Sequence, residues 1–177
     1  MTAAVLLLAL VVTGDGAPPP ATRVGVEVFA VALTGGTGET VAYARGVGEL
    51  ERGVNPDDRA REIAASLAGA VALIHSTSWR WEPDGRIVLT YVAWAKEGAL
   101  GAGARPLPPL APPGPTDPLH PRPVTIRELD PLAHGLRHLA FLLRTSGNGA
   151  LATAIGPRSA AALAKLEPAV AGELAPP

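Results

Sequence analysis

The sequence predicts an α+β fold: a single domain over residues 1–177, with a mixed, mostly antiparallel sheet and two to three helices packed on it. Three observations predict this fold. They are a β-hairpin at about 71–94, β-branched runs that precede it, and amphipathic segments that do not alternate regularly with strands. A chain of 177 residues has the length of one ordinary domain.

The composition narrows the classes of function. With 15 basic and 16 acidic residues the net charge is −1, so no overall field attracts nucleic acid or an anionic membrane. We therefore expect neither as a partner. The chain has no cysteine, which removes disulfides, thiol nucleophiles and thiolate metal sites from consideration.

The N-terminal residues 3–12 are apolar and fit either a buried first strand or a signal peptide. No Lys or Arg precedes them, and they are shorter than the roughly 20 residues that a membrane-spanning helix needs. These features favour a first strand that ends at the turn of residues 14–16. We accordingly expect a cytoplasmic protein.

Two strands and a helix are predicted next. Residues 23–33 and 40–44 are rich in β-branched side chains and flank a glycine-rich turn, so they are expected to pair. A helix is expected over 56–68, because Asn55 can cap it, Pro56 suits its first position, and two acids follow. The predicted inward stripe of this helix is Ala60, Ile63, Ala64 and Leu67.

The hairpin is the clearest signal in the chain. Residues 82–85, Glu-Pro-Asp-Gly, predict a type I turn with a bulge, since Gly85 can take a positive φ. The predicted pairs are Trp81–Ile87, Trp79–Leu89 and Thr77–Tyr91, all on one face. We expect the indoles to pack into the core or to floor a cleft. The candidate binding residues on this hairpin are His75, Trp79, Trp81 and Tyr91.

The second half of the chain is predicted to contain a long loop and helices. Residues 99–123 are rich in Gly and Pro, which suit neither a helix nor a sheet ladder, so they form an extended arm or a lid over a site. A short strand is possible at 124–126. A C-terminal helical segment spans 130–174: one helix runs from 130 to 143, and another from 157 to 174 is broken at Pro168.

The first of these two helices carries the second group of candidates. Its leucines form one stripe, and the opposite, solvent-facing side is predicted to hold the candidates His134, Arg137, His138 and Phe141. A metal site on the two histidines would lack the glutamate of the zinc-protease motif, because Gly135 stands there. Arginine, histidine and an aromatic ring together suit a partner surface or a pocket for an anionic ligand.

At Arg61-Glu62-Ile63 the order of elements resembles that of the Nudix hydrolases. In that family strands and a glycine-containing loop, here Gly46 and Gly48, precede a helix with Arg-Glu-aliphatic and a pair of glutamates. Family members grip Mg²⁺ with such glutamates beside a nucleoside diphosphate derivative. In this chain Ala65 and Ser66 occupy the positions of the pair and Gly53 that of the upstream glutamate. The carboxylates left for a metal are Glu62, Glu49 and Glu51.

One carboxylate on that helix is too few to hold a hard divalent cation well. The sequence therefore favours a non-catalytic, Nudix-like domain without a cofactor, which binds a small molecule or a protein partner. The first alternative is a magnesium-dependent hydrolase of nucleoside-diphosphate-type phosphoanhydrides. The second is a homodimeric structural or interaction protein, in which the hairpin edge and Phe141 are buried across a two-fold axis.

Overall fold

The computed structural model describes residues 22–34, 40–110, 126–145 and 149–170. The predicted first strand at 3–12, the turn at 35–38 and most of the predicted strand at 124–126 lie outside these residues; Ile126 is in no strand. The elements are β1 Val24–Thr34, β2 Thr40–Glu49, α1 Pro56–Leu67, β3 Val71–Trp81, β4 Ile87–Ala95, β5 Arg105–Pro106, α2 Asp130–Thr145, α3 Ala150–Ile155 and α4 Pro157–Ala164.

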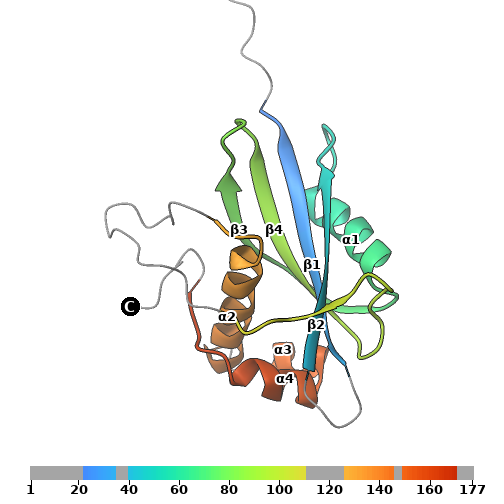
Figure 1. Cartoon of the computed structure of the whole chain (residues 1–177), viewed down its shortest axis with the longest axis vertical. Helices are drawn as coiled ribbons and strands as arrows, with labels where there is room; N and C mark the ends of the chain where they lie inside the picture. Colours follow the sequence, from blue (N-terminus) through green and yellow to red (C-terminus); the bar gives the residue numbers. More distant parts are fainter. Residues whose placement is uncertain (1–21, 35–39, 111–125, 146–148, 171–177) are drawn as a thin grey trace, which may run out of the picture.

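The sheet has five strands in the order β3-β4-β1-β2-β5 (Figure 1). Strands β1 and β2 pair antiparallel, as do β3 and β4, so the molecule contains two long antiparallel pairs. The pairs meet where β1 runs parallel to β4. This single parallel pairing makes the sheet mixed and confirms the predicted α+β fold.

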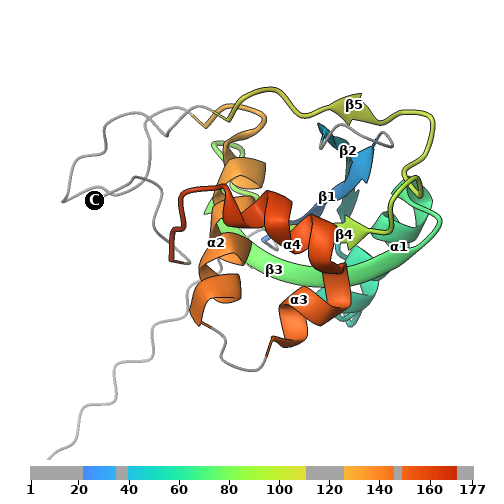
Figure 2. The ribbon, with the colours of Figure 1, turned by 90° about the horizontal axis from the view of Figure 1, so that it is seen from below.

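Helices cover both faces of the sheet, as Figure 2 shows. Helix α1 packs on one face, against Val28 and Ala30 of β1. Helices α2, α3 and α4 cover the other face, where Phe29 and Val31 point. Alternate side chains of β1 thus pack into two separate apolar clusters, one on each face of the sheet. For this reason β1 is buried along nearly its whole length.

Helix α1 forms where the sequence predicts it. The side chain of Asn55 accepts a hydrogen bond from the backbone N–H of Asp57 at 2.9 Å, and the predicted inward stripe faces the sheet. The two glycines expected in a loop, Gly46 and Gly48, instead lie within β2. A methyl group on Gly46 would come within 2.7 Å of Ile63, so the glycines let α1 approach the strand closely.

Strand formation extends beyond the predicted ranges. Strand β2 continues to Glu49 because its second half pairs with the first half of β1, and this pairing overrides the weak strand preference of glycine. The prediction that residues 99–123 form no sheet ladder is wrong at Arg105 and Pro106, which pair with Tyr43 and Ala42 at the sheet edge. A proline is compatible with an edge strand, where its missing N–H would face solvent.

The C-terminal helices depart most from the prediction. Helix α4 ends at Ala164, before Pro168, instead of continuing to 174. The short helix α3 was not predicted, because six residues between Gly149 and Gly156 are too few for a periodic signal. Both glycines have a positive φ, 63° and 83°, and they set the sharp changes of direction around α3.

The prediction of a solvent-facing side on α2 is wrong. His134 and His138 are only 4% and 8% exposed. Helix α2 packs on the sheet with its leucines, while residues that follow α4 cover another side, where the N–H of Ala169 donates to the carbonyl of Arg137 at 3.2 Å. The sequence shows amphipathic periodicity but not this second layer of covering chain.

Among the described residues, no helix combines the length and the apolar character that crossing a membrane requires.

Candidate binding surface on strand β3

Strand β3 is the last strand of the sheet, and no strand among the described residues pairs with its outer edge. It carries the two largest exposed apolar side chains of the described chain: Trp79 is 68% exposed and Trp81 is 45% exposed. The prediction that both indoles pack into the core is therefore wrong. The apolar cluster under α1 reaches Tyr91 and Ala93 of β4 but includes neither indole, so the indoles do not pack under this helix.

The hairpin itself forms as predicted. The N–H of Glu82 donates to the carbonyl of Arg86, and Gly85 adopts a φ of 79°. Trp81 pairs with Ile87 and Trp79 with Leu89. Further along, a β-bulge at Thr77 shifts the register by one residue, so Ser76 rather than Thr77 pairs with Tyr91.

Tyr91 is not part of an open surface. It is 4% exposed and its hydroxyl donates to Asp57 of α1 at 2.7 Å. Burial first, and then the hydrogen bond to the Asp57 carboxylate, raise the pKa of Tyr91 to about 12. This residue fastens α1 to the sheet, and the exposed candidates on this side of the hairpin are the two indoles.

A groove runs beside the other end of β3. It has a volume of about 340 Å³ and lies between the second half of α1 and the first half of the strand. It is lined largely by small and apolar residues, including Ala64, Ala68 and Ile74, together with Arg61. The outer edge of β3 is thus bordered by a groove at one end and by indoles at the other.

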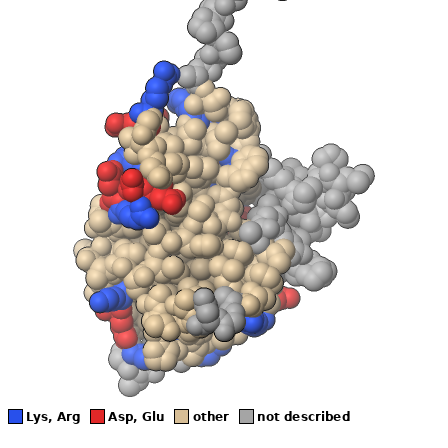
Figure 3. All heavy atoms as spheres, turned by 180° about the vertical axis from the view of Figure 1, so that it is seen from behind, with Lys and Arg blue, Asp and Glu red and all other residues tan. Residues whose placement is uncertain are grey.

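The edge strand carries no uncompensated charge. Arg80 is the only Lys, Arg, Asp or Glu in β3, and it binds Glu27 and Glu82 at 2.6 Å each. Figure 2 shows β3 on the side of the molecule away from β5, and Figure 3 shows that large parts of this side carry no charged side chains. An apolar, uncharged partner segment would therefore meet no unpaired charge on the strand.

Glu27 of β1 lies at the centre of a network of ion pairs and hydrogen bonds that extends across the sheet to β3. It is 1% exposed and accepts hydrogen bonds from Arg45 at 2.7 Å, from Arg80 at 2.6 Å and from Thr90 at 3.1 Å. Burial alone would raise the pKa of Glu27, but the hydrogen bonds and charges of Arg80 and Arg45 outweigh burial and lower it. This network ties β1, β2, β3 and β4 together, and none of the site residues predicted from the sequence belongs to it.

The face of β3 opposite the indoles holds the remaining aromatic candidates. His75 stacks on His138 of α2 with ring centroids 5.3 Å apart, and His138 stacks on Phe141. The structure therefore joins candidates that the sequence placed on two separate surfaces. Because His134 and His138 are buried, these side chains do not form an exposed partner surface, and His138 joins α2 to His75 of β3 instead.

The three carboxylates predicted to bind a metal are divided between two places. Glu49 and Glu51 line a pocket of about 400 Å³ with Arg23 and Arg52, whereas Glu62 forms an ion pair with Arg59 at 2.9 Å. In the part of the chain that the structure describes, no group of three or more His, Cys, Asp or Glu residues is arranged to hold a metal ion.

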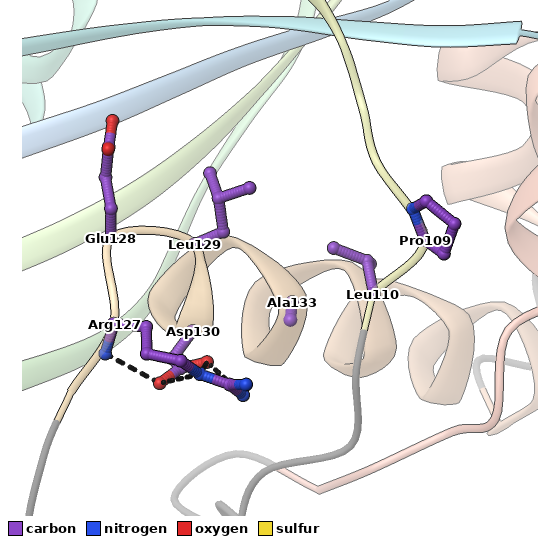
Figure 4. A pocket seen from close by; sticks show the side chains of 7 residues that line it. All are labelled: Pro109, Leu110, Arg127, Glu128, Leu129, Asp130 and Ala133. Atoms are coloured by element: carbon purple, nitrogen blue, oxygen red, sulfur yellow. Dashed lines mark hydrogen bonds and ion pairs between the residues drawn. The ribbon is translucent and has the colours of Figure 1, made fainter.

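A further pocket, of about 260 Å³, lies at the start of α2 (Figure 4). Pro109 and Leu110 form one side of it and the first residues of α2 the other. Its charged groups pair locally, since Arg127 binds Asp130 at 2.7 Å in the ion pair drawn in Figure 4. No candidate from the sequence lines this pocket.

Comparison of the chain with protein-family models gives no match, and comparison with curated proteins gives none either. The candidate surface is accordingly defined by the geometry of this chain alone.

Proposed function

We propose that this protein is a non-catalytic binding protein that captures an extended, uncharged polypeptide segment along the outer edge of β3. The observation that carries the proposal is the exposure of Trp79, 68%, on a terminal strand that no described strand covers. Exposed edge strands pair readily with added strands, and aromatic side chains are enriched at binding interfaces.

Two further observations support an extended polypeptide over a small molecule. The edge of an 11-residue strand offers a row of backbone donors and acceptors, which suits main-chain recognition. The groove between α1 and β3 lies beside the same edge and can receive alternate side chains of an added strand. A partner segment would thus gain backbone hydrogen bonds at the edge and apolar contacts on both ends.

The proposal includes a Nudix-like fold in which catalysis has been lost. It is supported by the order of elements, in which α1 follows two strands, and by the loss of all the expected carboxylates of this helix except Glu62. The hydrolase alternative is supported by the pocket that holds Glu49 and Glu51. Titration with Mg²⁺, followed by tryptophan fluorescence, tests it: saturable quenching that Glu62→Ala abolishes would favour the hydrolase.

The binding proposal is tested with a synthetic probe. A fluorescent peptide of about ten alternating Val and Thr residues, with a Lys at each end for solubility, imitates an uncharged strand. We expect saturable binding by fluorescence anisotropy, weakened at least ~10-fold by Trp79→Ser, because the indole covers the added strand. Val47→Ser is the matched control, since Val47 is a 48% exposed strand residue on β2.

A second peptide, with Pro at every other position, has no N–H at those positions and so tests backbone pairing. Equal binding of both peptides, no saturable binding by chains that are monomeric in the assay, or equal effects of the two serine variants would each overturn the proposal.

A further inference from the structure

The outer edge of β3 has a backbone pattern that is set by its pairing with β4. The N–H of Glu82 donates to Arg86 at one end of the hairpin, and the N–H of Lys96 donates to Ala70 at the other. Between these ends hydrogen-bonded and non-hydrogen-bonded pairs alternate. Ile87 belongs to a non-hydrogen-bonded pair, because its N–H donates to Arg23 on the far side of β4.

The same alternation identifies which residues of β3 direct their backbone groups outward. They are the partners of every second β4 residue from Ile87 to Ala95, namely Trp81, Trp79, Ser76, Ile74 and Val71. Bulges at Ala72 and Thr77 absorb the extra residues of β3, so these five residues keep an even spacing. Their side chains all point to the α1 face of the sheet.

This row has a small residue in its middle and bulky apolar residues on both sides of it. Ser76 is small and central, Trp79 and Ile74 flank it, and Trp81 and Val71 lie beyond them. An antiparallel copy of the strand centred on Ser76 would set Trp79 opposite Ile74 on both sides of the axis. Pairs of an aromatic and a β-branched residue directly opposite each other stabilise antiparallel strands.

We infer that the segment captured by the edge of β3 is the β3 strand of a second copy of this chain, paired antiparallel across a two-fold axis at Ser76. The inference rests on the proposed function and names its partner. The dimer has one continuous ten-stranded sheet, and the two Ser76 residues exchange a pair of backbone hydrogen bonds on the axis.

Charge and area both favour a second copy as the occupant. Strand β3 is itself an apolar segment whose one charged residue, Arg80, is held by Glu27 and Glu82 of its own chain, so two copies meet without like-charge repulsion. Trp79 alone exposes about 170 Å², given about 250 Å² for a large aromatic side chain, which is about a fifth of a standard interface per partner. The strand edge and the adjoining groove add to this area.

The first test measures mass in solution across a range of concentrations by sedimentation equilibrium. We expect the wild-type chain to approach twice its monomer mass of 18.0 kDa. Ser76→Lys places two ammonium groups against each other at the axis and should weaken the dimer at least ~10-fold. Val47→Lys, the same kind of change at an exposed residue of β2, should leave the dimer intact.

Ser76 also contacts the hydroxyl of Tyr91, so a second variant checks the axis without adding charge. The chain has no cysteine, so Ser76→Cys introduces a single thiol. Residues opposite each other in a hydrogen-bonded pair lie about 5.5 Å apart at Cα, which suits a disulfide. Mild oxidation should link Ser76→Cys chains in pairs and leave Val47→Cys chains unlinked.

The outcomes separate this inference from the proposed function. If the chain is a monomer at every concentration and still binds the Val-Thr peptide, the inference of a second copy is overturned, while the proposed capture of an extended segment stands. A dimer that Ser76→Lys leaves intact, or that Ser76→Cys does not link, would place the interface elsewhere and overturn the inference. A monomer that binds no peptide would overturn both.

Discussion

The imidazole rings of His75 and His138 lie stacked, with centroids 5.3 Å apart and planes inclined by 20°. One ring belongs to the edge strand β3 and the other to α2, so the stack joins the candidate surface to the helical layer. The Nε2 of His75 and the Nδ1 of His138 are buried without a hydrogen-bond partner. Both rings therefore favour the neutral form.

Stability is expected to depend on pH through this stack. Burial, and then the charge of the neighbouring His138, lower the pKa of His75 from 6.5; burial lowers the pKa of His138, although a hydrogen bond with Ala169 opposes it. Since the unfolded chain binds protons more readily, the free energy of unfolding is highest above pH 6.5 and falls as the pH drops from 6.5 to the folded pKa values.

Urea unfolding of the wild type and of His75→Phe between pH 7.5 and 5 measures this effect. The variant keeps an aromatic ring in the stack and removes one titrating group, so its stability should change less with pH. An equal decline in both proteins would show that the stack does not cause it.

The buried ion-pair network predicts an asymmetry between single and combined substitutions. Glu27→Gln leaves Arg45 and Arg80 without their shared counter-charge and should lower the free energy of unfolding by about 3 kcal/mol. Replacing the three ionic residues together, as Glu27→Leu with Arg45→Leu and Arg80→Met, should cost about 1 kcal/mol or less. Urea unfolding at pH 7 compares the two proteins. A triple variant less stable than the single one would contradict this account.

The contribution of Glu27 to stability should be lost at a lower pH than that of the histidine stack. Its folded pKa lies below 4.5, so its stabilising effect is present above that pH and disappears as the pH falls through the folded value. Thermal unfolding of the wild type below pH 4.5 should therefore show a decline that Glu27→Gln lacks. A decline of the same size in that variant would point to other carboxylates.

Gly135 is expected to be essential for the close approach of α2 to the sheet. A methyl group at this position would lie 2.6 Å from Cγ2 of Val92 and 3.1 Å from Cγ2 of Thr77. Gly135→Ala should therefore lower the free energy of unfolding by about 1–2 kcal/mol, although alanine is the better helix former. In a Val92→Ala background the cost should fall by more than half. Thermodynamic cycles from urea unfolding measure this coupling, and strict additivity would contradict it.

The three tryptophans should differ in their access to a quencher. Trp94 is 1% exposed, whereas Trp79 is 68% exposed. In the Ser76→Lys background, where strand pairing is blocked, Trp79→Phe should reduce the fraction of emission that acrylamide quenches. Trp94→Phe should increase that fraction, because it removes the most protected indole. Equal effects of the two variants would show that the exposed end of the hairpin is covered.

The parts of the fold that local sequence chemistry determines were predictable. The turn at Gly85 and the cap at Asn55 depend on a few adjacent residues, and both form as expected. The bulge at Thr77 and the burial of His138 depend on segments far apart in the chain, and periodicity does not report them. The same holds for Trp79, whose exposure depends on how far α1 extends along the sheet.

The Glu27 network did leave a signal in the sequence. A glutamate within the apolar run of β1, and an arginine between the two indoles of β3, are charged residues at places where strands are otherwise apolar. Because a buried charge needs an opposite one, such residues can be matched before a structure is known. The Nudix resemblance and the cytoplasmic location remain predictions from the sequence.

The parallel contact between β1 and β4 has a consequence for how the chain folds. Each antiparallel pair closes over a short stretch of chain, but Glu27 and Thr90, which meet at the seam between them, are 63 residues apart in the sequence. Closing so long a loop costs entropy before the seam yields any contacts. We therefore expect the two hairpins to form early and their docking to set the folding rate, so that variants at this seam slow refolding more than variants in either turn.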